Sequence, residues 1–332
     1  MNRSGHPQKI LIFHSGALGD LVNTLPAICC LKEKFPKAQV TAVGNLTFLA
    51  ALKTAGMIDH AISFDSCGFH SLFIDAPLPE KMRLFLEGFD LTVSWVRDPC
   101  LIKNIQKADS VVIGLREQFP PAIGSPHITE IMARPLTEAG IFPSSFFPRL
   151  KIPDSDQEQC LKFSGILVHP GSGSPKKNWS PQRFAGVIRN LMRHVEKDIA
   201  ILEGPADMEN AAKVIQELGD IQTLRYQNLS LVELIHLLDG SAMVLGNDSG
   251  VCHLAGAVGT PVVAIFGPTD PAVWGVRQPH AVNVVSGVSC SPCTHKEMWR
   301  CETRECLGSI TETQVVEACL KLIGTGSEKR PA

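Results

Sequence analysis

Short apolar runs alternate with longer segments of helical periodicity along most of the chain. Each run has the length of a single β-strand, and a polar or glycine-containing turn separates it from the segment that follows. The expected strands are residues 10–13, 40–43, 61–64, 91–94, 111–113, 166–168, 199–202, 243–245 and 262–266. Strands that alternate with helices in this way indicate parallel sheets with helices on both faces.

The helical segments carry their own start signals. Apolar side chains from Phe184 to Val195 recur at i, i+3, i+4, i+7, i+8 and i+11, and Ser180-Pro181 supplies an N-cap and a first helical residue. Ser230-Leu-Val-Glu233 and Thr311-Glu-Thr-Gln314 match the capping-box pattern. Helices are therefore expected after several of the strands and close to the end of the sequence.

A strand, a turn, a short helix and a second strand are expected between Met243 and Pro271. Asp248, Ser249 and Gly250 follow the first strand, and the segment from Gly267 to Asp270 follows the second. In an open α/β sheet, ligands bind beyond the carboxyl ends of the strands, where helix N-termini present free N–H groups to anions. The stretch predicts a nucleotide-diphosphate pocket; the alternative is an ordinary βαβ unit with turn-forming residues.

A second polar loop follows the strand that ends at Val168. Ser172, Gly173 and Ser174 offer hydroxyl groups and accessible N–H groups, and Lys176 and Lys177 add positive charge. Such a loop could simply be solvated. Its place at a strand's carboxyl end favours contact with a phosphate.

Carboxylates stand beside two further turns. Asp20 follows the first strand, where it can cap a helix or accept a proton from a substrate hydroxyl. Glu203, Asp207 and Glu209 surround the turn after residue 202, where they can hold a nucleoside sugar or base, or complement the dipole of the next helix. The dinucleotide fingerprint G-x-G-x-x-G is absent near Asp20, which argues against an NAD site.

Four of the eleven cysteines are clustered near the C-terminal end. Cys290, Cys293, Cys301 and Cys306 have the spacing C-x2-C-x7-C-x4-C, which allows a four-cysteine zinc site, a disulfide or free thiols. The other seven lie in apolar or helical segments, where a free cysteine behaves as a small buried hydrophobe.

Length and charge narrow the classes of protein. A chain of 332 residues exceeds what one core usually serves, so two domains are expected: residues 1–153 and 154–310, followed by a helix and tail at 311–332. A net charge of −2 gives no broad electrostatic case for binding nucleic acid. Neither a signal-peptide core nor an apolar run of membrane-spanning length is present, so a cytoplasmic protein is expected.

Four motifs, taken together, resemble the ADP-heptose:lipopolysaccharide heptosyltransferases of glycosyltransferase family 9. Their order along the chain matches the family, and the Cys290-Ser-Pro-Cys293 stretch resembles the heptosyltransferase II branch. The motifs are Gly16-Ala-Leu-Gly-Asp20 with Thr24-Leu-Pro26, His169-Pro-Gly with Lys177-Asn-Trp-Ser-Pro181, Asp248-Ser-Gly250 with His253-Leu-Ala255, and Phe266-Gly-Pro-Thr-Asp-Pro271.

The resemblance implies a GT-B fold, in which two Rossmann-like domains with doubly wound parallel sheets face a cleft. It implies an inverting transfer without a required metal or cofactor, with Asp20 as the base and Lys177 on the leaving diphosphate. The donor contacts that it implies are Ser172, Gly173, Glu209, Asp248, Ser249, Gly250, His253 and Thr269.

The substrates follow from the same resemblance. The donor would be ADP-heptose and the acceptor the lipid-linked lipopolysaccharide core, with peripheral contact at the cytoplasmic face of the inner membrane. Two departures are visible: Ser249 stands where many heptosyltransferases carry Thr, and residues 48–141 match no family motif. The alternatives are a GT-B glycosyltransferase or epimerase that uses another sugar nucleotide, and a non-catalytic sugar-nucleotide binding protein.

Overall fold

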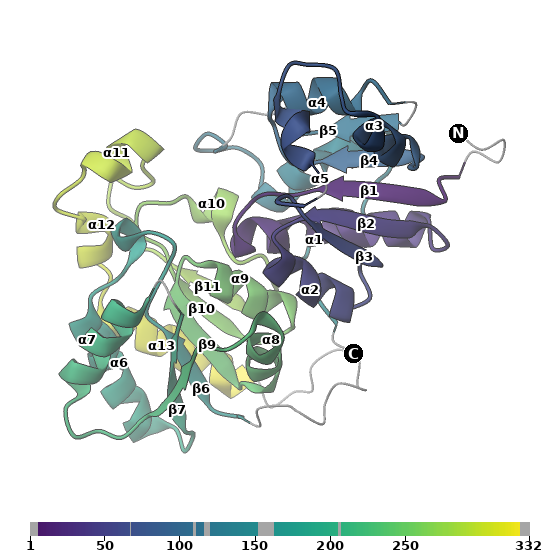
Figure 1. Cartoon of the computed structure of the whole chain (residues 1–332). Coiled ribbons are helices and arrows are strands. Elements are labelled where there is room, and N and C mark those ends of the chain that lie inside the picture. Colours follow the sequence, from purple (N-terminus) through teal and green to yellow (C-terminus); the bar gives the residue numbers. More distant parts are fainter. Residues whose placement is uncertain are drawn as a thin grey trace. The chain divides into compact units, whose positions relative to one another are not determined.

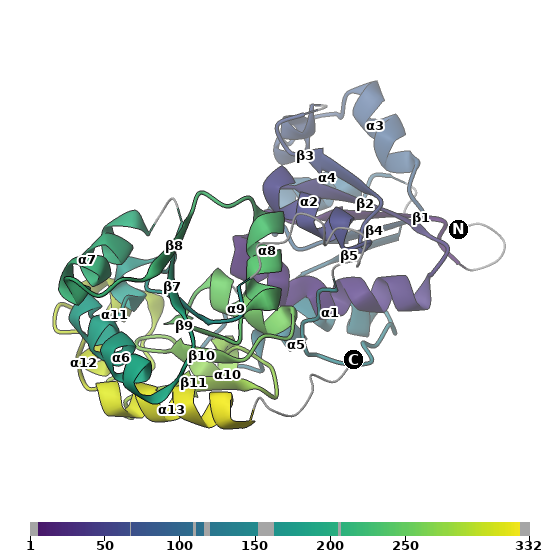
Figure 2. The same cartoon turned by 90° about the horizontal axis from the view of Figure 1, so that it is seen from below.

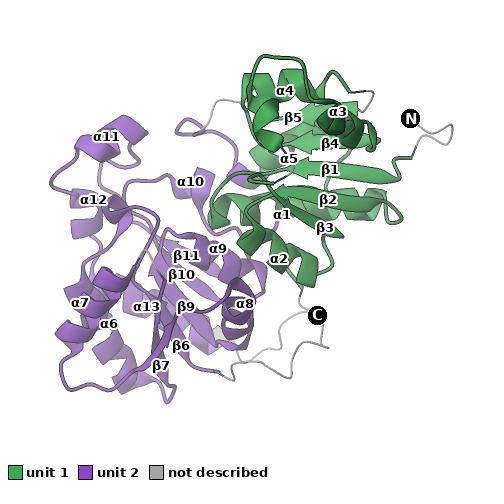
Figure 3. Ribbon diagram, in the orientation of Figure 1, with its two compact units in different colours: residues 1–118, 129–146, 150–154 green, residues 119–128, 147–149, 155–332 purple. Residues whose placement is uncertain are grey.

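The computed structural model describes residues 6–66, 68–108, 111–115, 120–151, 163–204 and 207–325. The chain forms two compact units (Figure 3). Unit 1 comprises residues 1–118, 129–146 and 150–154, and unit 2 comprises 119–128, 147–149 and 155–332. The expected boundary between residues 153 and 154 lies outside the described residues.

Unit 1 is built on a five-stranded parallel sheet with the order β3-β2-β1-β4-β5 (Figure 1). The strands are β1 (Lys9–Phe13), β2 (Gln39–Gly44), β3 (His60–Ser63), β4 (Leu91–Ser94) and β5 (Val111–Gly114). All four side chains of Ile10 to Phe13 are buried, as expected for a central strand covered on both faces.

Helices cover both faces of this sheet. They are α1 (Leu18–Lys34), α2 (Leu46–Thr54), η1 (Phe69–Phe73), α3 (Glu80–Glu87), α4 (Pro99–Ile105) and α5 (Ile128–Glu138). Side chains of η1, α3 and α4 share one core with Leu11 and Phe13. The crossovers β1→β2 and β4→β5 run in opposite directions along the sheet, so right-handed connections place α1 and α4 on opposite faces.

Unit 2 has a six-stranded parallel sheet with the order β11-β10-β9-β6-β7-β8. The strands are β6 (Ile166–His169), β7 (Ile199–Glu203), β8 (Leu224–Gln227), β9 (Met243–Asn247), β10 (Val262–Ile265) and β11 (Ala281–Val284). Sequence patterning predicted β6, β7, β9 and β10, whereas the edge strands β8 and β11 were missed.

The helices of unit 2 are η3 (Pro175–Lys177), α6 (Pro181–His194), α7 (Met208–Leu218), α8 (Leu231–Gly240), α9 (Gly250–Ala257), α10 (Pro271–Trp274), α11 (His295–Arg300), α12 (Glu305–Gly308) and α13 (Glu312–Thr325). One core joins α6, α7 and α13 to alternate residues of the central strands, such as Met243 and Leu245. Figure 2 shows α13 and α6 near each other on the sheet, and α13 also packs against β9, β10 and β11.

Both sheets reverse their strand order beside the first strand of the unit. In unit 1 the reversal lies between β1 and β4, and in unit 2 between β6 and β9. Loops that leave such neighbours diverge to opposite faces and open a crevice at the carboxyl ends. The topology therefore places the polar loops after β1, β6 and β9 where ligands bind in this class of fold.

Candidate functional site

The loops after β6, β9 and β10 bring three charged or polar side chains together in unit 2. Lys177 Nζ lies 2.8 Å from Asp248 Oδ2. The Thr269 hydroxyl donates to the same oxygen over 2.6 Å. Because Asp248 is only 6% exposed, its carboxylate is buried and balanced by these two donors.

The turn around Asp248 leads into α9. Ser249 is the N-cap, and its hydroxyl oxygen accepts from the Cys252 N–H over 3.4 Å. The N–H groups of Gly250 and Val251, in the first turn, cannot have partners within the helix. They form an N-terminal group of donors beside the Lys177 ammonium, which suits an anion.

His253 lies one turn further into α9 and is buried. Burial lowers the pKa of His253 to about 4, although the Asp248 carboxylate acts in the opposite direction; His127 and Lys177 lower it further. The imidazole is therefore neutral at neutral pH, and Lys177 remains the positive group next to Asp248.

The loop that carries Lys177 is folded on itself. The Ser172 hydroxyl lies 2.7 Å from both the Ser174 carbonyl oxygen and Asn178 Oδ1. Ser174 caps η3, where its hydroxyl accepts from the Lys176 N–H. Gly173 has open space on the side where a Cβ would stand. The Ser172 hydroxyl therefore shapes the loop, while the Gly173 main chain is accessible.

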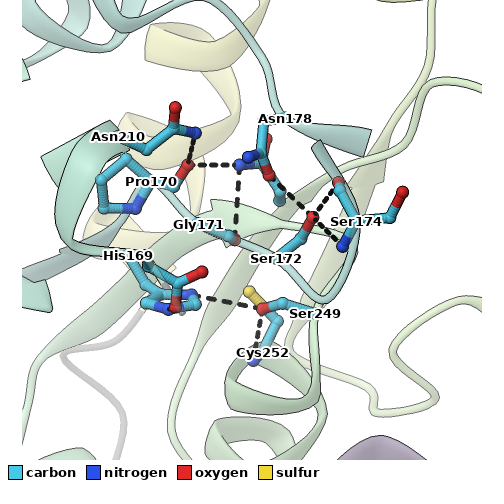
Figure 4. A network of polar contacts seen from close by, with 11 residues as sticks. His169, Pro170, Gly171, Ser172, Ser174, Asn178, Asn210, Ser249 and Cys252 are labelled. Carbon is cyan, nitrogen blue, oxygen red and sulfur yellow. Dashed lines mark hydrogen bonds and ion pairs between the residues drawn. The ribbon is translucent and has the colours of Figure 1, made fainter. Parts of the chain in front are cut away.

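Asn247 and Asn210 fix the start of this loop, and Figure 4 shows Asn210 beside Pro170. The Asn247 amide donates to the Pro170 carbonyl oxygen over 2.8 Å, and Asn210 donates to the same oxygen over 3.0 Å. Asn247 Oδ1 accepts from the N–H of Trp179, at the other end of the loop. These amides, which we did not identify from the sequence, hold both ends of the loop against the sheet.

The segment with the four clustered cysteines packs on the outside of the same loop. Lys176 Nζ donates to the Cys301 carbonyl oxygen over 2.7 Å, and Arg304 donates to the Pro175 carbonyl oxygen over 3.2 Å. Cys290 is exposed, Cys293 and Cys301 are half-buried, and Cys306 is buried; all four are free thiols. Within the described ranges, no three His, Cys, Asp or Glu side chains are arranged to hold a metal ion.

The helix-start acids of α7 point in different directions. Glu209 is 85% exposed and pairs with Lys213 at i+4. Asp207 is 11% exposed and faces inward, where its Oδ2 lies 2.8 Å from His169 Nε2. The structure thus places Glu209 on the outer side of the first helical turn and Asp207 beneath the loop of Lys177.

Asp20 lies in unit 1, in the first turn of α1. Its Oδ2 accepts from the Ala17 N–H over 3.0 Å, which is the capping role. A Cβ on Gly16 would lie 2.6 Å from Asp20 Cβ and 2.9 Å from its Oδ2, so the side chain rests against the Gly16 main chain. Burial lowers the pKa of the neighbouring His14 to about 4, partly offset by a hydrogen bond to the Asp20 main chain.

A cavity of about 450 Å³ opens beside Gly16 at the carboxyl ends of β1, β2 and β3. Its polar lining includes Asn45, Thr47, Ser63 and Asp65. Hydroxyl, amide and carboxylate groups of this kind can hydrogen-bond a polyhydroxylated ligand. None of these four residues was identified from the sequence; Ser63 and Asp65 lie in the segment 48–141 that matches no family motif.

Comparison with known proteins gives a consistent picture. Residues 128–301 match the model of glycosyltransferase family 9 (heptosyltransferase). The chain is 25% identical to lipooligosaccharide heptosyltransferase 2 of Campylobacter jejuni over an alignment that covers 95% of this chain and 98% of that protein.

Two solved structures share the fold over nearly the whole chain. A family 9 glycosyl transferase from Veillonella parvula has a TM-score of 0.77 at 19% identity, covering 96% of this chain and 98% of that one. The ADP-heptose lipopolysaccharide heptosyltransferase II of Escherichia coli has a TM-score of 0.75 at 16% identity, covering 96% and 99%. Both support two parallel-sheet domains of the GT-B type.

Proposed function

The chain belongs to glycosyltransferase family 9, the heptosyltransferase family, and on this premise we propose that it transfers heptose from ADP-heptose to the inner core of lipopolysaccharide. Family membership makes it a glycosyltransferase. The contact among Lys177, Asp248 and Thr269 supports the donor half of the proposal, because it holds an ammonium group beside the N-terminus of α9.

The donor diphosphate would bind at this edge of unit 2. Lys177 and the N–H groups of Gly173, Ser249 and Gly250 can neutralise the charge that grows on the diphosphate as its bond to the sugar breaks. Asp248 and His253 would orient the donor sugar or its phosphates, and Thr269 would line the same pocket. Asp248 would also orient Lys177, and Ser172 would shape the loop that carries it. Glu209, exposed on α7, is our proposed contact to the nucleoside.

Asp20 would act on the acceptor. Its carboxylate would take the proton of the acceptor hydroxyl as that oxygen bonds to the anomeric carbon and the diphosphate leaves as ADP. A single displacement of this kind inverts the configuration at the anomeric carbon. Lys177 and the N–H groups supply the positive charge for departure, so we propose that no metal ion is required.

The acceptor sugar would enter the cavity beside Gly16. Asn45, Thr47 and Ser63 offer hydrogen bonds to its hydroxyl groups, and Gly16 holds Asp20 near the same opening.

No described helix is both long and apolar enough to cross a membrane. We propose peripheral contact with the inner leaflet, and sedimentation with lipopolysaccharide-containing vesicles measures it.

Titration calorimetry tests the donor assignment. ADP, UDP and GDP are each titrated with and without magnesium, and we expect ADP to bind most tightly with no effect of magnesium. Preference for UDP or GDP would replace ADP-heptose by another sugar nucleotide. No binding by any of the three would remove the proposed donor site.

The Asp20→Asn variant tests the base. The amide keeps the size of the side chain but cannot accept the proton, so turnover should fall by ~10² or more while ADP affinity stays near that of the parent. Unchanged turnover would exclude Asp20 as the base.

A zinc ion on the four cysteines is a separate proposal and has no part in this reaction. The four thiols lie in one segment that packs on the loop of Lys177, but they are not arranged as a metal site. Metal analysis of protein purified without chelator decides the question. About one zinc per chain would support a structural ion, and far less would remove it.

A further inference from the structure

His169 connects two turns of the donor site from below. It is the last residue of β6, and its side chain is 2% exposed. Its Nε2 lies 2.8 Å from Asp207 Oδ2. Its Nδ1 lies 3.4 Å from Ser249 Oγ (Figure 4). One imidazole thus joins the turn that precedes α7 to the N-cap of α9.

The chemistry of the three groups fixes the protons. A carboxylate only accepts hydrogen bonds, so His169 Nε2 carries the proton that faces Asp207, and Nδ1 is the acceptor. In the neutral imidazole Nδ1 has no proton, so the Ser249 hydroxyl donates to Nδ1 while Ser249 Oγ accepts from the Cys252 N–H. The Ser249 hydroxyl is therefore engaged inside the protein, and Ser249 can meet an anion with its main-chain N–H.

Asp207 is held for this contact at the expense of capping its own helix. It occupies the N-cap of α7, but its side chain makes no cap hydrogen bond. Instead the carboxylate lies against Gly171, where a Cβ would stand 2.1 Å from Asp207 Cγ. Any side chain at Gly171 would displace the carboxylate from His169 and disturb the base of the loop that carries Lys177.

We propose that His169 is a positioning residue for the donor site, acting as a relay from Asp207 to Ser249. By fixing its tautomer, Asp207 directs the Ser249 hydroxyl inward and holds the first turn of α9 in place for the diphosphate. The inference rests on the proposed donor site. The proposal adds a coupling between the turn before α7 and the N-cap of α9, because Asp207 and Ser249 both contact the His169 imidazole.

A double-mutant cycle on ADP binding tests the relay. Asp207→Asn removes the charge that selects the tautomer, and Ser249→Ala removes the hydroxyl. Each should raise the ADP dissociation constant by roughly 3- to 10-fold, the range expected when one hydrogen bond is lost. The double variant should bind ADP at least ~3-fold more tightly than the product of the two effects predicts, because either change alone breaks the same relay.

The same cycle is then measured in a His169→Gln background. Glutamine can still donate to Asp207 but does not place an acceptor beside Ser249, so the two effects should become multiplicative. In the parent background, Ser249→Thr keeps the hydroxyl and should therefore bind ADP nearly as tightly as the parent, unlike Ser249→Ala. Asp198 is exposed and directly precedes β7, at the end of the strand away from the site. Asp198→Asn should therefore leave ADP binding unchanged.

Steady-state kinetics with ADP-heptose separate positioning from folding. The relay predicts that Asp207→Asn raises the donor KM with a smaller change in kcat, since the acceptor base lies in unit 1. A lower Tm with unchanged ADP affinity would leave His169 with a structural role only and overturn the proposal.

Nucleotide binding by the parent protein separates failure of the relay from failure of the proposed donor site. If it binds UDP or GDP instead of ADP, the donor assignment changes and the cycle is run with that nucleotide. If it binds none, both proposals are overturned. If ADP binds but Asp207 and Ser249 act independently in every background, only the relay is wrong. If His169→Gln does not fold, the cycle in the parent background alone decides.

Discussion

Lys177 Nζ and Asp248 Oδ2 are 2.8 Å apart, so the ammonium group proposed to bind the donor diphosphate already has a counter-ion in the protein. The lysine side chain is 26% exposed and the aspartate side chain 7%. Diphosphate can therefore approach Lys177 from its solvent-exposed side, while the buried Asp248 carboxylate holds the lysine on the other side. The pair keeps a flexible side chain in one orientation, which lowers the entropy lost on binding.

Lys177→Ala should weaken ADP binding by about 10- to 100-fold, because a hydrogen bond to a charged group contributes roughly 1.5–3 kcal/mol. The rate of transfer should fall as well, since charge on the leaving diphosphate is no longer balanced. Calorimetry and steady-state kinetics measure both. Lys197→Ala removes an exposed lysine just before β7, at the amino-terminal ends of the strands and away from the site. It should change neither ADP affinity nor the rate of transfer. Parent-like ADP affinity in Lys177→Ala would mean that the loop is only structural.

Asp248→Asn should separate stability from anion binding. The amide keeps the shape but leaves Lys177 without a full counter-ion, so the protein should lose about 1–3 kcal/mol of unfolding free energy. The same change removes a negative charge beside the proposed site, so inorganic pyrophosphate should bind several-fold more tightly. Thermal denaturation with increasing pyrophosphate measures both effects. Weaker pyrophosphate binding would contradict this prediction, because it would mean that the orienting effect of Asp248 on Lys177 outweighs the repulsion between the Asp248 charge and the anion.

Gly16→Ala should reproduce the catalytic effect of Asp20→Asn without changing any charge. The added methyl group would stand 2.6 Å from Asp20 Cβ, so the carboxylate must move. We expect turnover to fall by ~10-fold or more, with ADP affinity unchanged because the nucleotide would bind to unit 2. Gly324→Ala, at an exposed glycine of α13 where a methyl group meets open space, is the matched control and should leave turnover unchanged. Parent-like turnover in Gly16→Ala would contradict the proposed position of the base.

His14 should make unit 1 less stable in mild acid. Burial lowers its pKa to about 4 from an ordinary value of 6.5, so the folded state keeps the ring neutral while the unfolded chain binds a proton. The contribution of His14 is complete above pH 6.5 and is lost as the pH falls towards 4; between pH 7.5 and 5.0 the loss should be about 2 kcal/mol.

Hydrogen exchange of β1 amides at the two pH values, corrected for intrinsic rates, measures this change in opening free energy. The His14→Gln variant has no titrating ring and should lose correspondingly less on acidification. An equal loss in both proteins would assign the acid sensitivity of unit 1 to other groups.

The sequence predicted the central strands but not the edges of the second sheet. Ile166 to Val168 and Met243 to Leu245 are fully buried, and their uninterrupted apolar runs identify them. In β8, Leu224 is 49% exposed and Arg225 pairs with Glu203, so the segment has no apolar run. An edge strand pairs on one side only, so it can lack an apolar run, as β8 does. The edge strands β3 and β5 of unit 1 keep apolar residues and were predicted.

The candidate site was predicted as a set of positions rather than as a network. Lys177, Asp248 and Thr269 meet because their strands are neighbours in the sheet, an order that spacing along the chain does not reveal. The direction of a side chain was also beyond the sequence. Asp207 and Glu209 both begin α7, yet one faces His169 and the other solvent, since positions two apart on a helix lie on different faces.

The place of α13 in the second core affects how the protein is made. Val315 and Cys319 are completely buried against α6 and the strands β9, β10 and β11. This helix leaves the ribosome after every strand of the sheet that it covers. During synthesis the core on that face of the sheet is therefore completed only after the last helix has emerged, so unit 2 cannot reach its full packing before the end of α13 is made.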